Sequence, residues 1–184
     1  MGNAVTENLR VRSAITEALF RLMVQKSFSE ISISDIVRTA GVARASFYRN
    51  FENREAVIDG FLRTLHDEII ANPFRELSIQ TFSRELLIRQ LEYSFTCILR
   101  QKNHILLLCD NGFSAYLQEL ADEYVTILSR KIPYWSANRY LLYCISGASL
   151  NMIIHWLRDG AQESPRELAI ACAEFFMKSR NIYV

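Results

Sequence analysis

The chain has 184 residues, of which half are hydrophobic and only three are proline, and its formal net charge is +1 at pH 7. This composition is that of a globular protein and excludes a disordered or fibrous chain, and a charge so near zero excludes binding to nucleic acid through bulk positive charge alone. The length leaves room for one medium domain, or for a small module joined to a larger one, and excludes two full enzymatic domains.

Apolar residues recur every three or four positions through most of the sequence, whereas alternation with a period of two is nearly absent. The pattern predicts an all-α fold without strands. The first predicted helix carries an apolar stripe and ends near Lys26. That stripe consists of Val11, Ile15, Ala18, Leu19, Leu22 and Met23.

Two short helices follow the first one. Ser32 can cap a helix over residues 33–40, with Asp35 completing a weak capping box, and Gly41 can end that helix in the left-handed conformation. A second short helix is predicted over residues 44–50, only a few residues after the glycine. Asn53 is placed to cap a longer helix over residues 54–71.

Pro73 marks a candidate linker, and the rest of the chain again has helical periodicity. Helices are predicted from residue 81 or 83 to 100, and over residues 104–109, 114–131, 136–158 and 164–180. The last has the clearest start, because Ser164 can cap it, Pro165 occupies its first position and Glu167 completes a capping box. We therefore expect a helix-turn-helix domain over residues 1–53 and a helical domain over residues 54–184.

The cysteines indicate a reducing compartment rather than a disulfide framework, because they are widely spaced and lie among apolar neighbours. All of them are predicted to be buried thiols: Cys97, Cys109, Cys144 and Cys172. No cofactor or metal site is indicated. The most apolar stretch, residues 140–157, is interrupted by serine, glycine, asparagine and histidine, so we expect no membrane span and a cytoplasmic protein.

The segment over residues 43–50 has the composition of a helix that enters the DNA major groove. Phe47 is expected to anchor it to the core together with a phenylalanine four residues later. Ala43 and Ala45 would let the helix backbone approach the base edges closely, and Arg44 can reach guanine or a phosphate. The charge distribution is consistent with an anionic partner for this segment. Residues 1–54 carry eight Lys and Arg against five Asp and Glu, whereas the remainder carries thirteen Lys and Arg against fifteen Asp and Glu.

The run ISDIVRTAGVARASFYRNFENRE, residues 33–55, resembles the N-terminal signature of TetR-family regulators, and the resemblance extends over about residues 9–60. It implies phosphate contacts for Tyr48 and Arg54, and a weaker one for Thr39. Two positions depart from the usual pattern: Ala43 stands where Ser or Thr often caps the second helix, and Asn50 stands where His is common. The predicted DNA-binding residues are Ser32, Thr39, Ala43, Arg44, Ala45, Ser46, Tyr48, Arg49, Asn50 and Arg54.

Residues 72–184 contain no pair of carboxylates, His/Cys cluster or glycine-rich phosphate loop that would suggest an enzyme. The resemblance implies that this region holds a ligand cavity and that its last two long helices form a homodimer. Bulky residues of the middle helices are the predicted pocket lining: Phe95, Cys97, Leu107, Phe113, Tyr116, Tyr143, Met152 and Trp156. Mostly small residues of the last two helices are the predicted dimer interface: Ser146, Ser149, Ala169, Ala173 and Phe176.

Together these patterns predict a DNA-binding transcriptional regulator, a repressor that a small-molecule effector releases from a palindromic operator. One alternative is a co-regulator that acts mainly through a protein partner, since the excess positive charge of residues 1–54 is small. A second alternative is a helical ligand-binding protein or enzyme that carries a borrowed helix-turn-helix. Loss of promoter recognition on replacing Arg44 distinguishes the first interpretation from both.

Overall fold

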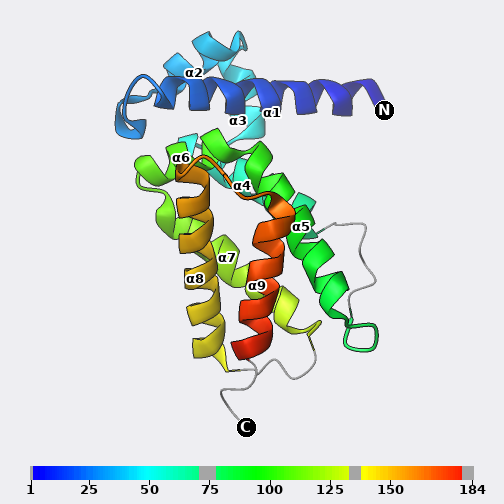
Figure 1. Ribbon diagram of the computed structural model, residues 1–184. Coiled ribbons are helices and arrows are strands. Elements are labelled where there is room, and N and C mark those ends of the chain that lie inside the picture. Colours follow the sequence, from blue (N-terminus) through cyan, green and yellow to red (C-terminus); the bar gives the residue numbers. More distant parts are fainter. Residues whose placement is uncertain (1, 71–77, 133–137, 180–184) are drawn as a thin grey trace. The chain divides into compact units, whose positions relative to one another are not determined.

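The computed structural model describes residues 2–70, 78–132 and 138–179, and within these ranges it contains helices and turns but no strand (Figure 1). The all-α prediction is confirmed. The chain divides into two compact units: unit 1 comprises residues 1–64 and 107–111, and unit 2 comprises residues 65–106 and 112–184. The predicted boundary after residue 53 precedes a helix that both units share.

Unit 1 is built from the helices that surround the predicted helix-turn-helix. They are α1 (Gly2–Met23), the 3-10 turn η1 (Phe28–Glu30), α2 (Ile33–Ala40), α3 (Arg44–Asn50), the first part of α4 (Arg54–Ile70) and the end of α6 (Lys102–Asp110). Helix α1 begins well before the first apolar residue of its stripe, Val11, because the stripe marks only the part that packs. Ile15 and Leu19 on α1, and Ile36 on α2, are fully buried in the core.

Unit 2 contains the remaining helices. They are α5 (Arg84–Arg100), α7 (Ser114–Ser129), α8 (Arg139–Arg158) and α9 (Pro165–Ser179), together with the end of α4 and most of α6. Helix α5 packs against α9, and α7 packs against α8. Across the first pair Arg166 donates to Glu92 at 2.9 Å and to Glu85 at 3.2 Å. Such exposed ion pairs favour the register of the two helices more than they add stability.

Helix starts that the sequence predicted from capping residues appear in the structure. The Asn53 side chain accepts from the Ala56 amide at 2.7 Å, and at α9 the Ser164 amide donates to the Glu167 carboxylate at 2.8 Å. Helix α8 begins at Arg139, with the Asn138 side chain accepting from the Tyr140 amide. The predicted start at residue 136 lies outside the described residues.

The cysteine prediction is partly wrong. Cys97 and Cys172 are buried, as expected, and burial raises the pKa of the Cys172 thiol to about 11. Cys144, however, is exposed, and Cys109 is half-buried. A residue with apolar neighbours in the sequence is still exposed when it lies on the side of the helix that faces solvent.

The capping box of α2 makes unit 1 sensitive to acid. The Asp35 carboxylate accepts from Lys26 Nζ at 2.9 Å and from the Ser32 amide at 3.1 Å, and these bonds hold its pKa well below the usual range. A lowered folded-state pKa stabilises the fold above the unfolded-state value of about 3.9, and that contribution disappears as the pH falls below it.

We therefore expect the free energy of unfolding to decrease as the pH falls from about 5 to 2, and to decrease less in Asp35→Asn. Urea unfolding followed by circular dichroism at several pH values measures both slopes. Equal slopes for wild type and variant would show that Asp35 does not carry this dependence.

Candidate functional site

The turn between α2 and α3 is fixed by local chemistry. Gly41 has a φ of +67°, the left-handed region that a residue with a side chain rarely adopts. Its amide donates to Arg38 O at 3.3 Å, and the Val42 amide donates to Val37 O at 3.1 Å. These two bonds form a Schellman motif, which ends α2 and turns the chain directly into α3.

Helix α3 presents one face to the core and the other to solvent. Phe47 is fully buried, Phe51 is 5% exposed, and their ring centroids lie 6.1 Å apart. The opposite face carries exposed side chains: Ala43, Arg44, Ala45, Tyr48 and Arg49. Because the alanines are small, the backbone of this face is accessible along the helix. The sequence prediction that this segment points outward agrees with the observed exposure.

Arg44 lies over the junction of the two helices. Its Nη1 donates to Ser34 Oγ on α2 at 2.9 Å, and its Nη2 donates to Tyr48 Oη at 3.2 Å. The guanidinium carbon is 5.6 Å from the centre of the Tyr48 ring. Arg49, one turn further on, donates to Ser46 Oγ at 2.8 Å. The two cations are thus ordered on the exposed face by hydroxyl groups of their own unit.

Four of the predicted DNA-binding residues are less available than the sequence suggested. Arg54 is half-buried, and its Nη1 donates to the carbonyl oxygens of Phe28 at 3.0 Å and of Ile31. Asn50 is also half-buried, and its amide nitrogen donates back to Ser46 O at 2.8 Å. Thr39 and Ser46 are half-buried, whereas Ser32 is exposed but accepts from the Asp35 amide. A phosphate role for Arg54 remains a prediction, and the structure gives it a second role in holding η1.

Sequence reasoning did not single out Arg12 of α1. Its Nη1 donates to Asn50 O at 2.9 Å, and its guanidinium stacks 4.4 Å from the centre of the Phe51 ring. A cation over an aromatic face adds electrostatic attraction to the packing. Arg12 therefore fixes the end of α3 against α1. The available signal was its place on α1 one turn before Ile15, beside the apolar stripe.

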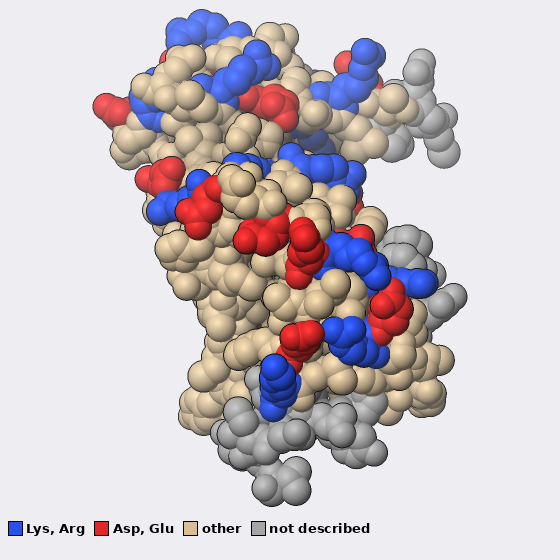
Figure 2. Space-filling view, viewed as in Figure 1, with Lys and Arg blue, Asp and Glu red and all other residues tan. Residues whose placement is uncertain are grey.

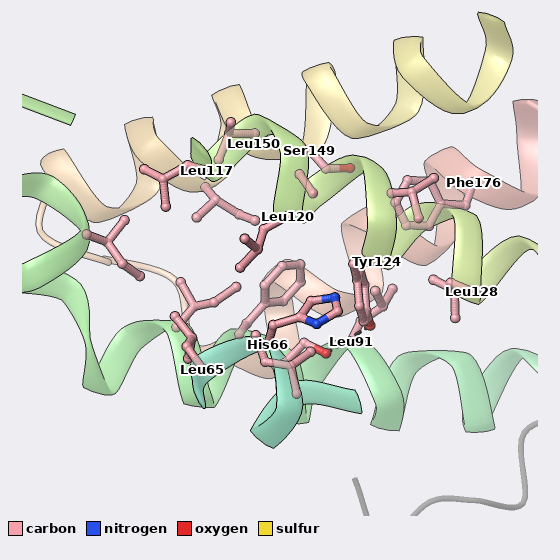
Figure 3. A pocket seen from close by; sticks show the side chains of 18 residues that line it. Leu65, His66, Leu91, Leu117, Leu120, Tyr124, Leu128, Ser149, Leu150 and Phe176 are labelled. Atoms are coloured by element: carbon pink, nitrogen blue, oxygen red, sulfur yellow. Dashed lines mark hydrogen bonds between the residues drawn. The ribbon is translucent and has the colours of Figure 1, made fainter. Parts of the chain in front are cut away.

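Helices of unit 2 line a partly open cavity of about 110 Å³ (Figure 3). Its lining comes from α4 to α9 and is almost entirely apolar, with four polar residues: His66, Ser94, Tyr124 and Ser149. The apolar lining residues are Leu65, Ile69, Leu91, Phe95, Ile98, Ile105, Leu117, Leu120, Ala121, Val125, Leu128, Leu150, Ile153 and Phe176. Among the described residues no group of three or more His, Cys, Asp or Glu is arranged to hold a metal ion.

Only Phe95 of the predicted pocket residues lines this cavity. Tyr116 and Tyr143 are instead exposed, by 41% and 54%, and Trp156 is buried with its Nε1 donating to Glu163 O at 3.0 Å. The others are also absent from the lining of the cavity: Cys97, Leu107, Phe113 and Met152. The criterion of large side-chain size selected residues that fill the core as well as residues that line a cavity, because a large aromatic side chain can do either.

The predicted dimer interface also needs correction. Ser146, Ala169 and Ala173 are fully buried within the chain, and Phe176 is 4% exposed. Ser149 is half-buried, and with Phe176 it lines the cavity. The small size of Ser146, Ala169 and Ala173 serves packing inside the unit, and the Ser146 hydroxyl also bonds to Asp122 on α7.

Other side chains of α8 and α9 are exposed, and several of them are apolar or aromatic. A Cβ added at Gly147 would meet no atom within 4 Å, and Phe175 is half exposed. Among the described residues, α8 is the one helix that is long and apolar enough to cross a membrane. Only 22% of its apolar stretch is buried, so much of this apolar helix is exposed. We call this the α8–α9 face; its exposed residues are Tyr140, Tyr143, Cys144, Ala148, Asn151 and His155 on α8, and Glu167, Ala171, Glu174, Phe175 and Lys178 on α9.

Two family models match the chain, one in its N-terminal part and one in its C-terminal part. Residues 15–60 match the family model described as "Bacterial regulatory proteins, tetR family". Residues 87–178, half of the chain, match the model described as "Transcriptional regulator C-terminal region".

Among curated proteins, the chain is 29% identical over 62 residues to the HTH-type transcriptional regulator AlkX of Mycobacterium tuberculosis, which covers 34% of this chain and 29% of that protein. It is 27% identical over 92 residues to the uncharacterized HTH-type transcriptional regulator YxbF of Bacillus subtilis, which covers 50% of this chain and 23% of that protein. The chain therefore aligns with less than a third of the length of these relatives.

Solved structures resemble the chain over nearly its whole length. The dihydroxyacetone kinase operon activator DhaS has a TM-score of 0.63 at 18% identity, covering 94% of this chain and 97% of that one. The fatty acid degradation regulator FadR from Bacillus halodurans has a TM-score of 0.65 at 14% identity, covering 91% and 94%. These similarities establish a shared fold. With the two family models, they show that this chain belongs to the TetR family of bacterial regulatory proteins.

Proposed function

We propose that this protein is a DNA-binding transcriptional regulator that reads a palindromic operator as a homodimer and is released from it by a small molecule bound in unit 2. The observation that carries the proposal is the outward face of α3. It combines two alanines, which permit close approach, with Arg44, Tyr48 and Arg49, which can bind base edges and phosphates. The buried phenylalanines of the opposite face pack that helix against the core.

Electrostatics support the same assignment. Basic side chains are prominent around α2 in the visible part of unit 1, whereas on unit 2 basic and acidic side chains lie next to one another (Figure 2). Ion pairs occur in both units, for example Lys26–Asp35 in unit 1 and Arg84–Glu174 in unit 2. On α3, in contrast, the recorded hydrogen bonds of Arg44 and Arg49 go to neutral hydroxyl groups, so the positive charge of these two residues is available to attract a polyanion.

The proposed homodimer uses the α8–α9 face. Exposed aromatic side chains such as Tyr140 and Phe175 are candidate contacts between subunits, and a second copy of the same face is their simplest complement. Dimerisation gives the regulator two α3 helices, and a palindromic operator presents two half-sites about 34 Å apart along the duplex.

The cavity is the proposed effector site because it lies among the helices of unit 2 and is lined mainly by apolar side chains with few polar groups. An effector would act by binding one arrangement of the dimer more tightly than another, which lowers the population that fits the operator. We place the protein in the cytoplasm, where the bacterial chromosome lies, and assign it no enzymatic activity.

Selection of bound sequences from a random DNA pool tests the proposal. We expect an enriched palindrome and a logarithm of the association constant that falls steeply as the logarithm of salt concentration rises. Failure to enrich any sequence, with little dependence on salt, would favour a co-regulator that acts through a protein partner.

Replacing Arg44 by alanine should weaken binding to the selected operator by about 1–3 kcal/mol, because a long donor on the groove-facing side of α3 is lost. The matched control is Arg84→Ala, which removes the same charge from unit 2 and should leave the affinity close to wild type. Fluorescence anisotropy with labelled operator measures both. Equal affinities for the two variants would exclude a reading role for Arg44.

A further inference from the structure

The polar groups of the unit 2 cavity differ in whether they already have a hydrogen-bond partner. Ser94 Oγ donates to Gln90 O at 2.9 Å and lies 2.9 Å from Tyr124 Oη. Those two hydroxyls therefore satisfy each other and the backbone. Burial raises the pKa of the Tyr124 phenol, so this group stays protonated and neutral.

His66 of α4 is different. It is only 9% exposed and lines the cavity, and its Nε2 is buried without a hydrogen-bond partner among the described residues. The nearest charged group recorded for it, Glu123 Oε2, lies 3.9 Å away, which is too far for a hydrogen bond. Figure 3 shows the imidazole ring pointing into the space between Leu120 and Tyr124. A buried polar atom left without a partner costs free energy, which a ligand that supplies the partner would recover.

The lining also restricts the charge of a ligand. No Lys, Arg, Asp or Glu is among the residues that line the cavity, so a ligand charge would be buried without a counter-charge. The carboxylate of Glu123 near His66 further disfavours an anionic group at that position. Size is restricted too, since the volume of about 110 Å³ is of the same order as the dry cavity of about 150 Å³ that accommodates benzene, and the cavity is partly open, so a ligand built on a single ring is of suitable size.

We infer that the effector is a small, uncharged, mostly hydrocarbon molecule with one hydroxyl or carbonyl group, and that His66 Nε2 is the group that binds that oxygen. This inference rests on the proposed function only in taking the cavity as the effector site. A hydroxyl can both donate and accept, so it can pair with either tautomer of the imidazole.

Three probes of closely related shape test the inference by titration calorimetry on the full chain: p-cresol with a hydroxyl, p-xylene with none, and the anion p-toluate. We expect p-cresol to bind roughly tenfold more tightly than p-xylene, because the hydrocarbon leaves Nε2 unpaired. We expect p-toluate to bind more weakly than either. Equal affinity for p-cresol and p-xylene, tightest binding of p-toluate, or no binding by any probe would each overturn the inference.

Variants test whether His66 causes the preference for p-cresol over p-xylene. His66→Phe, similar in size, should bind p-cresol and p-xylene alike, whereas His66→Gln, which keeps a donor and an acceptor, should retain part of the preference. The matched control is His104→Phe, which replaces a histidine outside the cavity lining and should keep the full preference. A preference that survives His66→Phe would show that another group binds the oxygen.

Binding of these probes is measured without DNA, and operator selection is measured without probes. If the probes do not bind as expected but the selection enriches a palindrome, this inference is refuted and the DNA-binding proposal stands. The reverse result would refute DNA binding while preserving a cavity specific for neutral oxygen-bearing hydrocarbons.

Discussion

Replacing Phe175 by aspartate should convert the proposed dimer into monomers and abolish tight binding to a palindromic operator. Phe175 is half exposed on the α8–α9 face. If two copies bury this face against each other, each aspartate becomes a buried charge without a partner, at a cost of about 3–5 kcal/mol. A monomer retains one α3 helix and thus loses the second half-site.

Sedimentation velocity measures the association, and gel mobility shift with the selected operator measures its consequence. The matched control is Ile79→Asp, which introduces the same charge at a large exposed hydrophobic residue outside α8 and α9. We expect Ile79→Asp to sediment and bind as wild type does. A Phe175→Asp protein that still sediments as a dimer would show that the subunits associate through another surface.

Replacing Phe47 by alanine should destabilise unit 1 by about 3–5 kcal/mol, the usual cost of removing a large aromatic side chain from a packed core. Phe47 is fully buried and contacts the rings of Tyr48 and Phe51. Typical domains are stable by about 5–15 kcal/mol, so the loss is a large share of the total. We expect α3 to lose its fixed orientation and DNA binding to disappear, although no DNA-facing side chain has changed.

Hydrogen exchange measures this effect by region, because amides of α1 to α3 should lose protection while those of α7 and α8 keep theirs. Tyr48→Ala is the control, since Tyr48 is the adjacent aromatic residue of the same helix and is 50% exposed. It should lower operator affinity with little change in protection. Unchanged protection of α1 to α3 in Phe47→Ala would contradict the assignment of Phe47 to the core.

The helix-turn-helix could be predicted from the sequence residue by residue, because its signals are local. The observed bounds of α2 and α3 are those expected from Ser32, Gly41 and the break after Asn50. Each of these residues acts within one turn of its own position, through a side-chain cap or a left-handed φ. Phe47 and Phe51, four residues apart, then determined which face of α3 is buried.

The cavity and the exposed α8–α9 face could not be predicted in the same way, because they depend on which faces of distant helices meet. Small residues at Ser146 and Ala173 indicated close helix approach, but nothing local specified that the neighbour belongs to the same chain. The exposed stripe through Tyr140 and Cys144 follows helical spacing, yet so does the buried one beside it.

His66 illustrates a signal that was present and not used. It lies four residues after Leu62 and three before Ile69, so a polar ring interrupts an otherwise apolar face of α4. Such an interruption on a buried face implies either a hydrogen-bond partner in the core or a cavity. Only the packing of the other helices decides between the two.

Unit 1 is not a continuous stretch of chain, since residues 107–111 belong to it, and the Phe28 amide donates to the Asn111 side-chain oxygen at 3.2 Å. A fragment truncated at Thr64 would therefore lack part of its own scaffold, including the fully buried Leu108. Chimaeric regulators made by grafting this DNA-reading head onto a foreign sensor would have to transplant that five-residue segment at the end of α6 as well, so the chimaera needs three junctions rather than one.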